Sequence, residues 1–189
     1  MKERPILFSG DMVRSILDGR KTQTRRPVKP HHLRGSEEPG QVLNILGRGL
    51  LKEASLLCPL GQPGDRLWVR ETWAPFNPHQ SHGCCYRADN DLRELQTQPG
   101  TAFRWRPSIH MPRWASRITL EITRVWVERV HDITDQNAFN EGAPTTTGCL
   151  DDPCVMSFRQ GFNDLWQSIY GTWAANPWVW AVEFRRMKP

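Results

Sequence analysis

A short basic segment near the start of the chain places a lysine close to two threonines. Lys21 and Thr24 could form a nucleophile–base pair, because a partly desolvated lysine loses its proton more easily and can then accept one from a hydroxyl. If the segment is a strand, Lys21 and Arg25 face one side and Thr24 faces the other. The two groups therefore meet only if the alternation breaks at a bend. The alternative is a solvated basic strand whose threonines serve β-propensity.

The other side chains of this segment suit binding better than bond breaking. Arginine grips a phosphate with a planar fork that lysine lacks. We therefore assign contacts with a substrate or its phosphate to the neighbours of the pair, which are Arg20, Thr22, Arg25 and Arg26.

Two carboxylates could accompany the basic segment. Glu71 continues the inward face of Leu67 and Val69, so it must be paired or lie in a wet pocket. An inward salt bridge with an arginine and a contact with substrate are both open for it. Glu141 falls in the last turn of a short predicted helix, where the helix dipole does not favour a carboxylate. Glu141 therefore either serves in a functional site or is an exposed residue at the end of the helix.

Tryptophans and arginines are interspersed in two later stretches. Bases stack on tryptophan while arginines bind phosphate, so this mixture suits RNA or a nucleotide. We expect about half of these tryptophans to pack under loops instead. The residues nearest the alternating stretch join the substrate-contacting set, namely Trp68, Arg70, Glu71 and Trp73; the others are Trp105, Arg106, Arg113, Trp114 and Arg117.

The composition favours a polyanionic partner. The 189 residues include nine tryptophans and 25 basic residues, of which 20 are arginine, and the formal net charge is +5. RNA or a modified nucleoside is the expected partner, and a monomer is favoured. The five cysteines form no regular framework and no C-x-x-C pair, so neither a disulfide scaffold nor a metal site is expected.

Several classes of protein are excluded by missing patterns. The chain has no P-loop, dinucleotide fingerprint, H-E-x-x-H or serine-elbow motif, and we expect no cofactor. It has no apolar signal core and no apolar run of membrane-spanning length, which predicts a cytoplasmic protein with no membrane partner.

The elements that must position these residues can be read from periodicity. Strands are expected at residues 5–8, directly after Gly19, at 66–73, at 117–127 and at 178–185. Ser9 is expected to cap a first helix, which Gly19 ends. Thr134 is expected to cap a short helix that ends at Glu141. An amphipathic helix is expected between Phe158 and Gly171. Residues 31–57 and 75–115 are poorly patterned and are expected to be long excursions.

Strands without regular helical crossovers indicate an α+β fold. A small mixed or antiparallel β-barrel with two or three flanking helices fits this order better than a doubly wound sheet. The length suits a single domain spanning residues 1–189.

Three motifs resemble the ASCH family, and they occur in the family's order across almost the whole chain. Residues 19–26 resemble its G-x-K-x-x-T-x-R signature, residues 64–69 its G-D-x-L-x-V strand, and residues 138–142 its A-x-x-E-G element. The last helix and residues 176–180 are similar to a longer branch that is common in phages and prophages. The resemblance implies a PUA-like β-barrel with a central cleft.

The resemblance also implies roles for individual residues. Small ASCH members include amidohydrolases that remove the acetyl group of N4-acetylcytidine with a lysine, a threonine and a glutamate. Lys21 would then be the base, Thr24 the nucleophile, and Glu141 the group that orients Lys21. The chain is nearly twice as long as those enzymes, and it carries Glu71 and many tryptophans that they lack.

Three functions stay open from the sequence. The first is an amidohydrolase acting on N4-acetylcytidine or a related modified nucleoside. The second is a non-catalytic RNA-binding module of phage origin. The third is a ribonuclease in which Lys21, Arg25 or Arg26 would stabilise a phosphorane.

Overall fold

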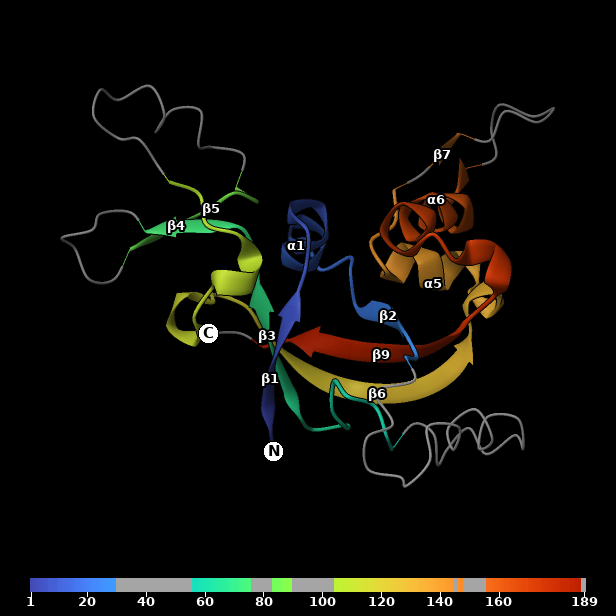
Figure 1. Cartoon of the computed structure of the whole chain (residues 1–189), viewed down its shortest axis with the longest axis horizontal. Coiled ribbons are helices and arrows are strands. Elements are labelled where there is room, and N and C mark those ends of the chain that lie inside the picture. The colour runs from blue at the N-terminus through green and yellow to red at the C-terminus, as the bar shows by residue number, and fades with distance from the viewer. Residues whose placement is uncertain (30–55, 76–82, 90–103, 145, 148–155, 188–189) are drawn as a thin grey trace.

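The computed structural model describes residues 1–29, 56–75, 83–89, 104–144, 146–147 and 156–187 of the chain. Its fold is α+β, as the sequence predicts. A five-stranded sheet has the order β1 (Glu3–Leu7), β3 (Arg66–Arg70), β6 (Thr119–Arg129), β9 (Trp178–Arg186) and β2 (Gln23–Pro27) (Figure 1). Only β1 and β3 run parallel; the other three pairings are antiparallel.

The long pair of β6 and β9 forms the centre of the sheet. Nine residue pairs join the two strands, from Leu120 opposite Arg186 to Arg129 opposite Trp178. The register shifts between Ile122 and Arg124, which marks a β-bulge, and a bulge increases the local bend of a strand. Both strands curve visibly beneath the helices (Figure 1).

The described strands do not close into a barrel, because β1 and β2 are the two edges of the sheet and do not pair with each other. Helix α1 (Gly10–Leu17) connects them and lies above the gap between them (Figure 1). One side chain also bridges the gap: Nη2 of Arg26 in β2 donates to the carbonyl oxygen of Leu7 in β1 at 2.9 Å. A helix and a guanidinium thus occupy the place where a barrel would have backbone pairing.

All three predicted helices are confirmed, together with their caps. Ser9 accepts from the backbone of Met12 at the start of α1, and Thr134 accepts from Asn137 at the start of α5 (Asp135–Asn140). Helix α6 (Phe158–Tyr170) has Ser157 as its N-cap and Gly171 as its C-cap. Positive φ angles at the three helix stops require glycine or strain, and Gly19, Gly142 and Gly171 meet that need.

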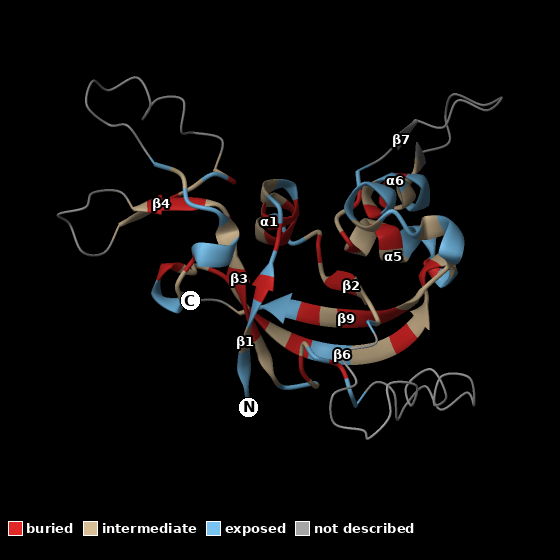
Figure 2. Cartoon of the chain, viewed as in Figure 1, coloured by how far each residue is buried: buried red, intermediate tan, exposed pale blue. Residues whose placement is uncertain are grey.

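Buried hydrophobic residues form three clusters, and the buried residues of the chain are coloured red in Figure 2. The main one fills the space between the sheet and α1, with Val13, Ile16, Leu120 and Trp180 at its centre. A second cluster joins α5 and α6, with Phe162 and Trp166 as its largest members. The third is small and comprises Trp73, Met111 and Ala115.

The third cluster holds together the described part of the second predicted excursion. Strand β4 (Trp73–Pro75) pairs with β5 (Cys84–Tyr86), and two short 3-10 turns follow, η2 (Ser108–His110) and η3 (Arg113–Ala115). Of the first predicted excursion, only residues 56 and 57 belong to the described residues.

The remaining elements are short. The 3-10 turns η4 (Val130–Asp132) and η5 (Trp173–Ala175) flank the second cluster, and β7 (Thr146–Thr147) pairs with β8 (Met156–Ser157). Within the described ranges, no helix has both the length and the apolar character needed to cross a membrane. In the same part of the chain, no group of three or more potential metal ligands lies together.

Candidate functional site

The C-terminal ends of α1 and α5 meet at the basic segment. This contact brings together Lys21 and Glu141, which are 120 positions apart in the sequence. The amide of Lys21 donates to the carbonyl of Ser15 near the end of α1, at 2.8 Å. The amide of Thr22 donates to the carbonyl of Asn140 at the end of α5, also at 2.8 Å. Lys21 is therefore held between the C-terminal ends of both helices, where carbonyl groups attract a cation.

The ammonium of Lys21 is buried and hydrogen-bonded at every proton. Nζ donates to the carbonyls of Gln23 and Glu141, both at 2.7 Å, and to Oε2 of Glu141 at 2.9 Å. Its side chain has no exposed surface. Burial lowers the pKa of Lys21 from its ordinary value, and the carboxylate of Glu141 opposes part of that shift.

A second cation shares the same carboxylate. Nη1 of Arg25 donates to Oε1 of Glu141 at 3.1 Å, and Nε donates to Glu128 at 2.6 Å. The side chain of Arg25 is also fully buried. Two cations and two carboxylates therefore balance in one cluster, which compensates the high cost of burying charge. We call Lys21, Arg25, Glu128 and Glu141 the sealed charge cluster.

Thr24 lies beside the sealed charge cluster without joining it. It is buried, with 1% of its surface exposed, and stands opposite Val182 of β9. Among the described residues, Lys21 makes its three hydrogen bonds to other acceptors, so the predicted Lys21–Thr24 contact is not made here. Lys21 precedes β2 and Arg25 lies within it, and both side chains are directed toward Glu141.

Arg20 and Thr22 secure the helix ends. Arg20 donates to the carbonyl of Ala143 at 2.9 Å and to the hydroxyl of Ser15 at 2.7 Å, which ties α1 to the chain after α5. The carbonyl of Thr22 accepts from the amide of Phe184 in β9 at 2.9 Å. Both residues thus have structural contacts where the sequence predicted contacts with a substrate.

Gly142 makes the approach of the two helices possible. Its φ is +76°, and a β-carbon added there would lie 2.9 Å from Cβ of Ser15 and 3.3 Å from Cβ of Lys21. Any larger residue would push against both. The A-x-x-E-G element therefore supplies a carboxylate and, directly after it, the one residue small enough for close packing.

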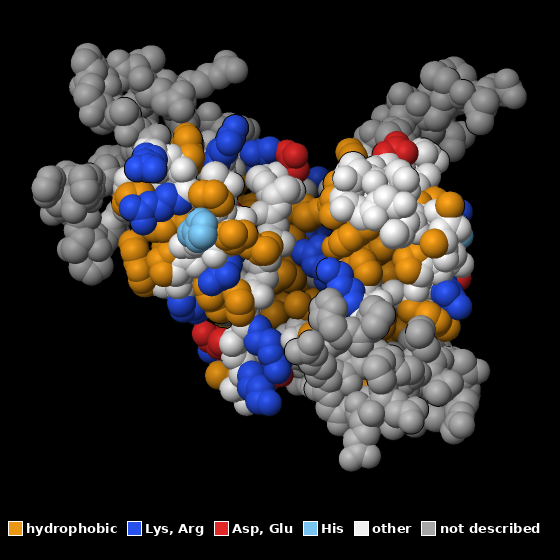
Figure 3. Space-filling model, in the orientation of Figure 1, with side chains coloured by type: hydrophobic (Ala, Val, Ile, Leu, Met, Phe, Trp, Pro, Cys, Tyr) orange, Lys and Arg blue, Asp and Glu red, His pale blue; other side chains and the backbone are white. Residues whose placement is uncertain are grey.

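A cleft of about 670 Å³ lies beside the end of β2, where Arg26 and Pro27 contribute to its lining. Its described lining comes from β1, α1, the ends of β2 and β3, and the end of α6. Three cationic side chains, Arg26, Lys29 and Arg70, line it, and none of the described lining residues is a carboxylate. Figure 3 shows blue side chains in the hollow between the lobe with α1 and the lobe with α6.

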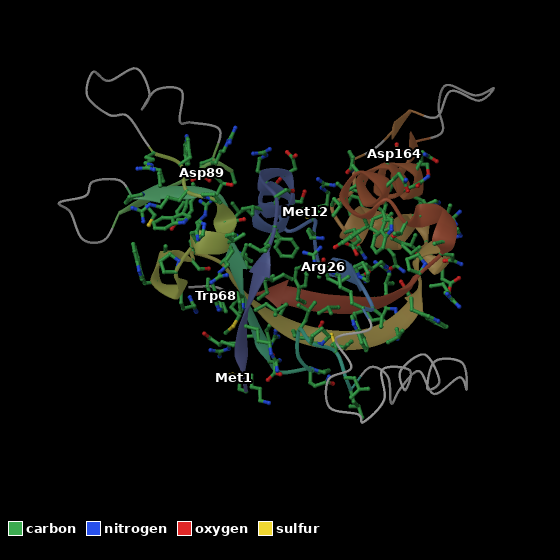
Figure 4. The ribbon with its side chains drawn as sticks, viewed as in Figure 1. Met1, Met12, Arg26, Trp68, Asp89 and Asp164 are labelled. Carbon is green, nitrogen blue, oxygen red and sulfur yellow. The ribbon has the colours of Figure 1, made fainter. Side chains whose placement is uncertain are left out.

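Arg26 lies between two aromatic rings of the cleft. It sits beneath Met12 of α1 in Figure 4. Its guanidinium is 5.6 Å from the ring centre of Phe8, and its Nη1 donates to the hydroxyl of Tyr170 at 3.3 Å. Phe8 also covers Lys21, whose Nζ is 5.2 Å from the same ring centre. One phenylalanine therefore separates the cleft from the sealed charge cluster.

Glu71 is paired in the way that its inward position required. Arg117 binds both of its carboxylate oxygens, at 2.9 and 3.1 Å, and also binds Asp89. Burial raises the pKa of Glu71, and Arg117 opposes the shift. Nearby, burial raises the pKa of Tyr86 to about 12, with its ring centre 4.0 Å from the Arg117 guanidinium. We call Glu71, Asp89 and Arg117 the rim charge cluster.

The two tryptophans of the predicted substrate set differ in place. Trp73 is buried in the third cluster, with 1% of its surface exposed. Trp68 is mostly covered, and the guanidinium of Arg70 lies 4.6 Å from its ring centre. Of the set Trp68, Arg70, Glu71 and Trp73, only Arg70 lines the cleft, and its Nε is buried without a hydrogen bond among the described residues.

Comparisons with known proteins gave no match, whether the chain was compared with family models, with curated proteins or with solved structures. The site therefore has to be interpreted from its own geometry.

Sequence reasoning missed three residues of this region. Glu128 completes the sealed charge cluster, while Phe8 and Tyr170 form the aromatic walls of the cleft. Phe8 ends a predicted strand and Tyr170 ends a predicted helix, so both could be placed on elements. What they face depends on how β1 and α6 are placed around Arg26, for which the sequence carries no local signal.

Proposed function

We propose that this protein binds a nucleoside unit of RNA in the cleft between α1 and α6. The observation that carries the proposal is a pocket with three cations and no carboxylate among its described lining residues. Apolar and aromatic groups make up most of the remaining walls, including Phe8, Met12 and Tyr170. A ligand that fits such walls has a planar apolar part and a negative charge, as a nucleotide does.

The size of the cleft agrees with this ligand. Pockets for small ligands have volumes of about 300–1,000 Å³, and this cleft has about 670 Å³. The Nε of Arg70 is buried without a hydrogen bond among the described residues, and a turn of this side chain toward a phosphate or base oxygen would remove the cost of the unpaired donor.

We propose in addition that the sheet is a PUA-like barrel of the ASCH type, left open between β1 and β2. The arguments are the order of the three motifs and the way in which the first and the third meet. The G-x-K-x-x-T-x-R segment and the A-x-x-E-G element form one cluster through Lys21 and Glu141, at 2.9 Å. Independent surface motifs have no physical reason to converge in this way.

Deacylation of N4-acetylcytidine is a second candidate, favoured by one observation. Burial lowers the pKa of Lys21, which stands one phenylalanine away from the cleft. In that reaction Thr24 Oγ would attack the acetyl carbonyl while its proton passes to a neutral Lys21. The C–N bond would break with protonation of N4, and water would then release acetate from the threonine ester.

We prefer binding to deacylation because the ammonium of Lys21 is fully hydrogen-bonded. Its three hydrogen bonds occupy all three protons of an ammonium, so a basic role requires loss of a proton and movement of Phe8. A cleft for binding requires neither change.

The binding proposal is tested with Arg26 and a short probe. A labelled three-nucleotide RNA is titrated into the wild type, Arg26→Ala and Tyr170→Phe, with fluorescence anisotropy as the readout. We expect Arg26→Ala to weaken binding by about tenfold or more, as for loss of a charged hydrogen bond. Tyr170→Phe keeps the aromatic wall and should change affinity by less than about threefold. Absence of binding by the wild type would refute the proposal.

The deacylation candidate is tested with a panel of modified nucleosides and mass spectrometry. Wild-type protein should convert N4-acetylcytidine to cytidine and acetate, and both Lys21→Ala and Thr24→Val should stop the reaction. A folded wild type that releases no acetate from any member of the panel removes this candidate and leaves the binding proposal intact.

A further inference from the structure

A second hollow adjoins the cleft across one short turn. It has a volume of about 410 Å³ and is lined by Arg104, Trp105, Arg106, Pro107 and His110. Ser108 at the start of η2 lines the cleft, and Pro107, the preceding residue, lines the second hollow. Consecutive Cα atoms are about 3.8 Å apart. A chain-like ligand that leaves the cleft at Ser108 therefore reaches the second hollow within its next units.

The segment that forms this hollow is anchored to the sheet. The backbone of Arg106 pairs with Trp73 in both directions, at 2.8 and 3.3 Å. Trp73, Met111 and Ala115 pack together beneath it. The hydroxyl of Ser116 donates to the carbonyl of Val69 in β3 at 2.8 Å. The surface thus has a fixed position relative to the cleft.

The exposed charges of the segment are positive. Arg104, Arg106 and His110 are exposed, and neither arginine forms an ion pair with a carboxylate of the described chain. The guanidinium of Arg106 lies 5.2 Å from the ring centre of Trp73, which orients it without neutralising it. In Figure 3 the lobe to the left of the central hollow carries blue and orange side chains close together.

A large aromatic side chain is exposed on the same segment. Trp114 has 64% of its surface exposed and meets the buried Trp73 edge-on, with ring centres 5.7 Å apart. Exposure of an indole leaves a large apolar area in water. An exposed ring on the same segment as arginines that have no carboxylate partner among the described residues is an arrangement that can stack a base while its phosphates are bound.

We propose that residues 104–114 form a second contact surface for single-stranded RNA whose neighbouring nucleotide occupies the cleft. Arg104, Arg106 and His110 bind phosphates, and Trp114 stacks a base. The ligand is then a polymer of several nucleotides and not a free nucleoside. This inference rests on the proposed function of the cleft and specifies its substrate class.

The test compares a three-nucleotide with a twelve-nucleotide single-stranded RNA by anisotropy at two salt concentrations. We expect the wild type to bind the longer RNA at least tenfold more tightly. Arg104→Glu and Trp114→Ala should each weaken binding of the longer RNA by about fivefold to a hundredfold, the range for loss of one stacked base. Neither should change binding of the shorter RNA. Both residues are exposed, so folding is retained, which circular dichroism checks.

The matched control is Arg124→Glu, an exposed arginine on β6, outside the lining of both hollows. It makes the same change in charge and should alter binding of the longer RNA by less than threefold. Equal affinity for both RNA lengths, or an equal effect of the control, overturns the second surface while the cleft still binds the short probe. Equal binding of duplex RNA or of single-stranded DNA also overturns it. If the wild type does not bind even the short probe, the proposed function of the cleft fails first.

Discussion

The sealed charge cluster and the rim charge cluster each bury a carboxylate, and they do so in different ways. Glu141 is held by Lys21 and Arg25, whose side chains have no exposed surface. Glu71 is held by Arg117, whose side chain is 25% exposed and which also binds Asp89. Water can replace a lost partner at the rim and cannot do so in the sealed cluster. We therefore expect burial of the partner, more than burial of the carboxylate, to set the cost of breaking a pair.

The largest effect is expected from Glu141→Gln. It leaves Lys21 without a carboxylate partner and Arg25 with Glu128 alone, and loss of one partner of a buried pair costs about 3–5 kcal/mol. The free energy of unfolding in urea measures the loss. A change below about 1 kcal/mol would contradict the description of this cluster as sealed.

A somewhat smaller effect is expected from Gly142→Ala. A positive φ and the close contacts with Ser15 and Lys21 together should cost about 3 kcal/mol, the upper end for a strained residue. Gly171→Ala is the matched control, because its φ is +64° and no atom lies within 4 Å of the added carbon. That control should cost about 1 kcal/mol. Equal losses in thermal or urea unfolding would mean that the contact between the helix ends contributes nothing.

Glu71→Gln should cost less than either change. Arg117 keeps Asp89 and access to water, so the expected loss is about 1–2 kcal/mol. Glu121→Gln removes the partner of Arg185, which is 70% exposed, and should cost under about 1 kcal/mol. The comparison of the two clusters fails if Glu71→Gln destabilises the protein as much as Glu141→Gln does.

The smallest effects are expected in the pH dependence of stability, where the two clusters should give opposite signs. The pKa of Lys21 is lowered from 10.5, so between its folded value and 10.5 the unfolded chain holds more protons, and this group makes stability rise with pH. The pKa of Glu71 is raised from 4.5, so just above 4.5 the folded chain holds more protons, and this group makes stability fall with pH. Stability curves of Lys21→Met and Glu71→Gln, each subtracted from the wild type, should therefore slope in opposite directions in those two windows. Parallel curves would refute the assigned shifts.

The same strand shows why neighbouring arginines have different fates. Arg25 and Arg26 are consecutive in β2, and alternation sends them to opposite faces. Arg25 enters the sealed charge cluster, and Arg26 enters the cleft. Their alternation was readable from the sequence, but which face would be sealed and which would be open was not.

The amino-acid sequence by itself determined the elements and their ends. Capping side chains, glycine stops and apolar periodicity act within a few residues, so α1, α5, α6 and the main strands could be predicted closely. The resemblance of the motifs to the ASCH family also implied that Lys21 and Glu141 belong together. Only the tertiary structure decided that Thr24 stays outside their contact, that Glu128 completes the charge balance, and that Phe8 and Tyr170 wall the cleft. Those outcomes depend on how β1, β2 and α6 pack, and packing is set by long-range contacts that leave no local pattern in the chain.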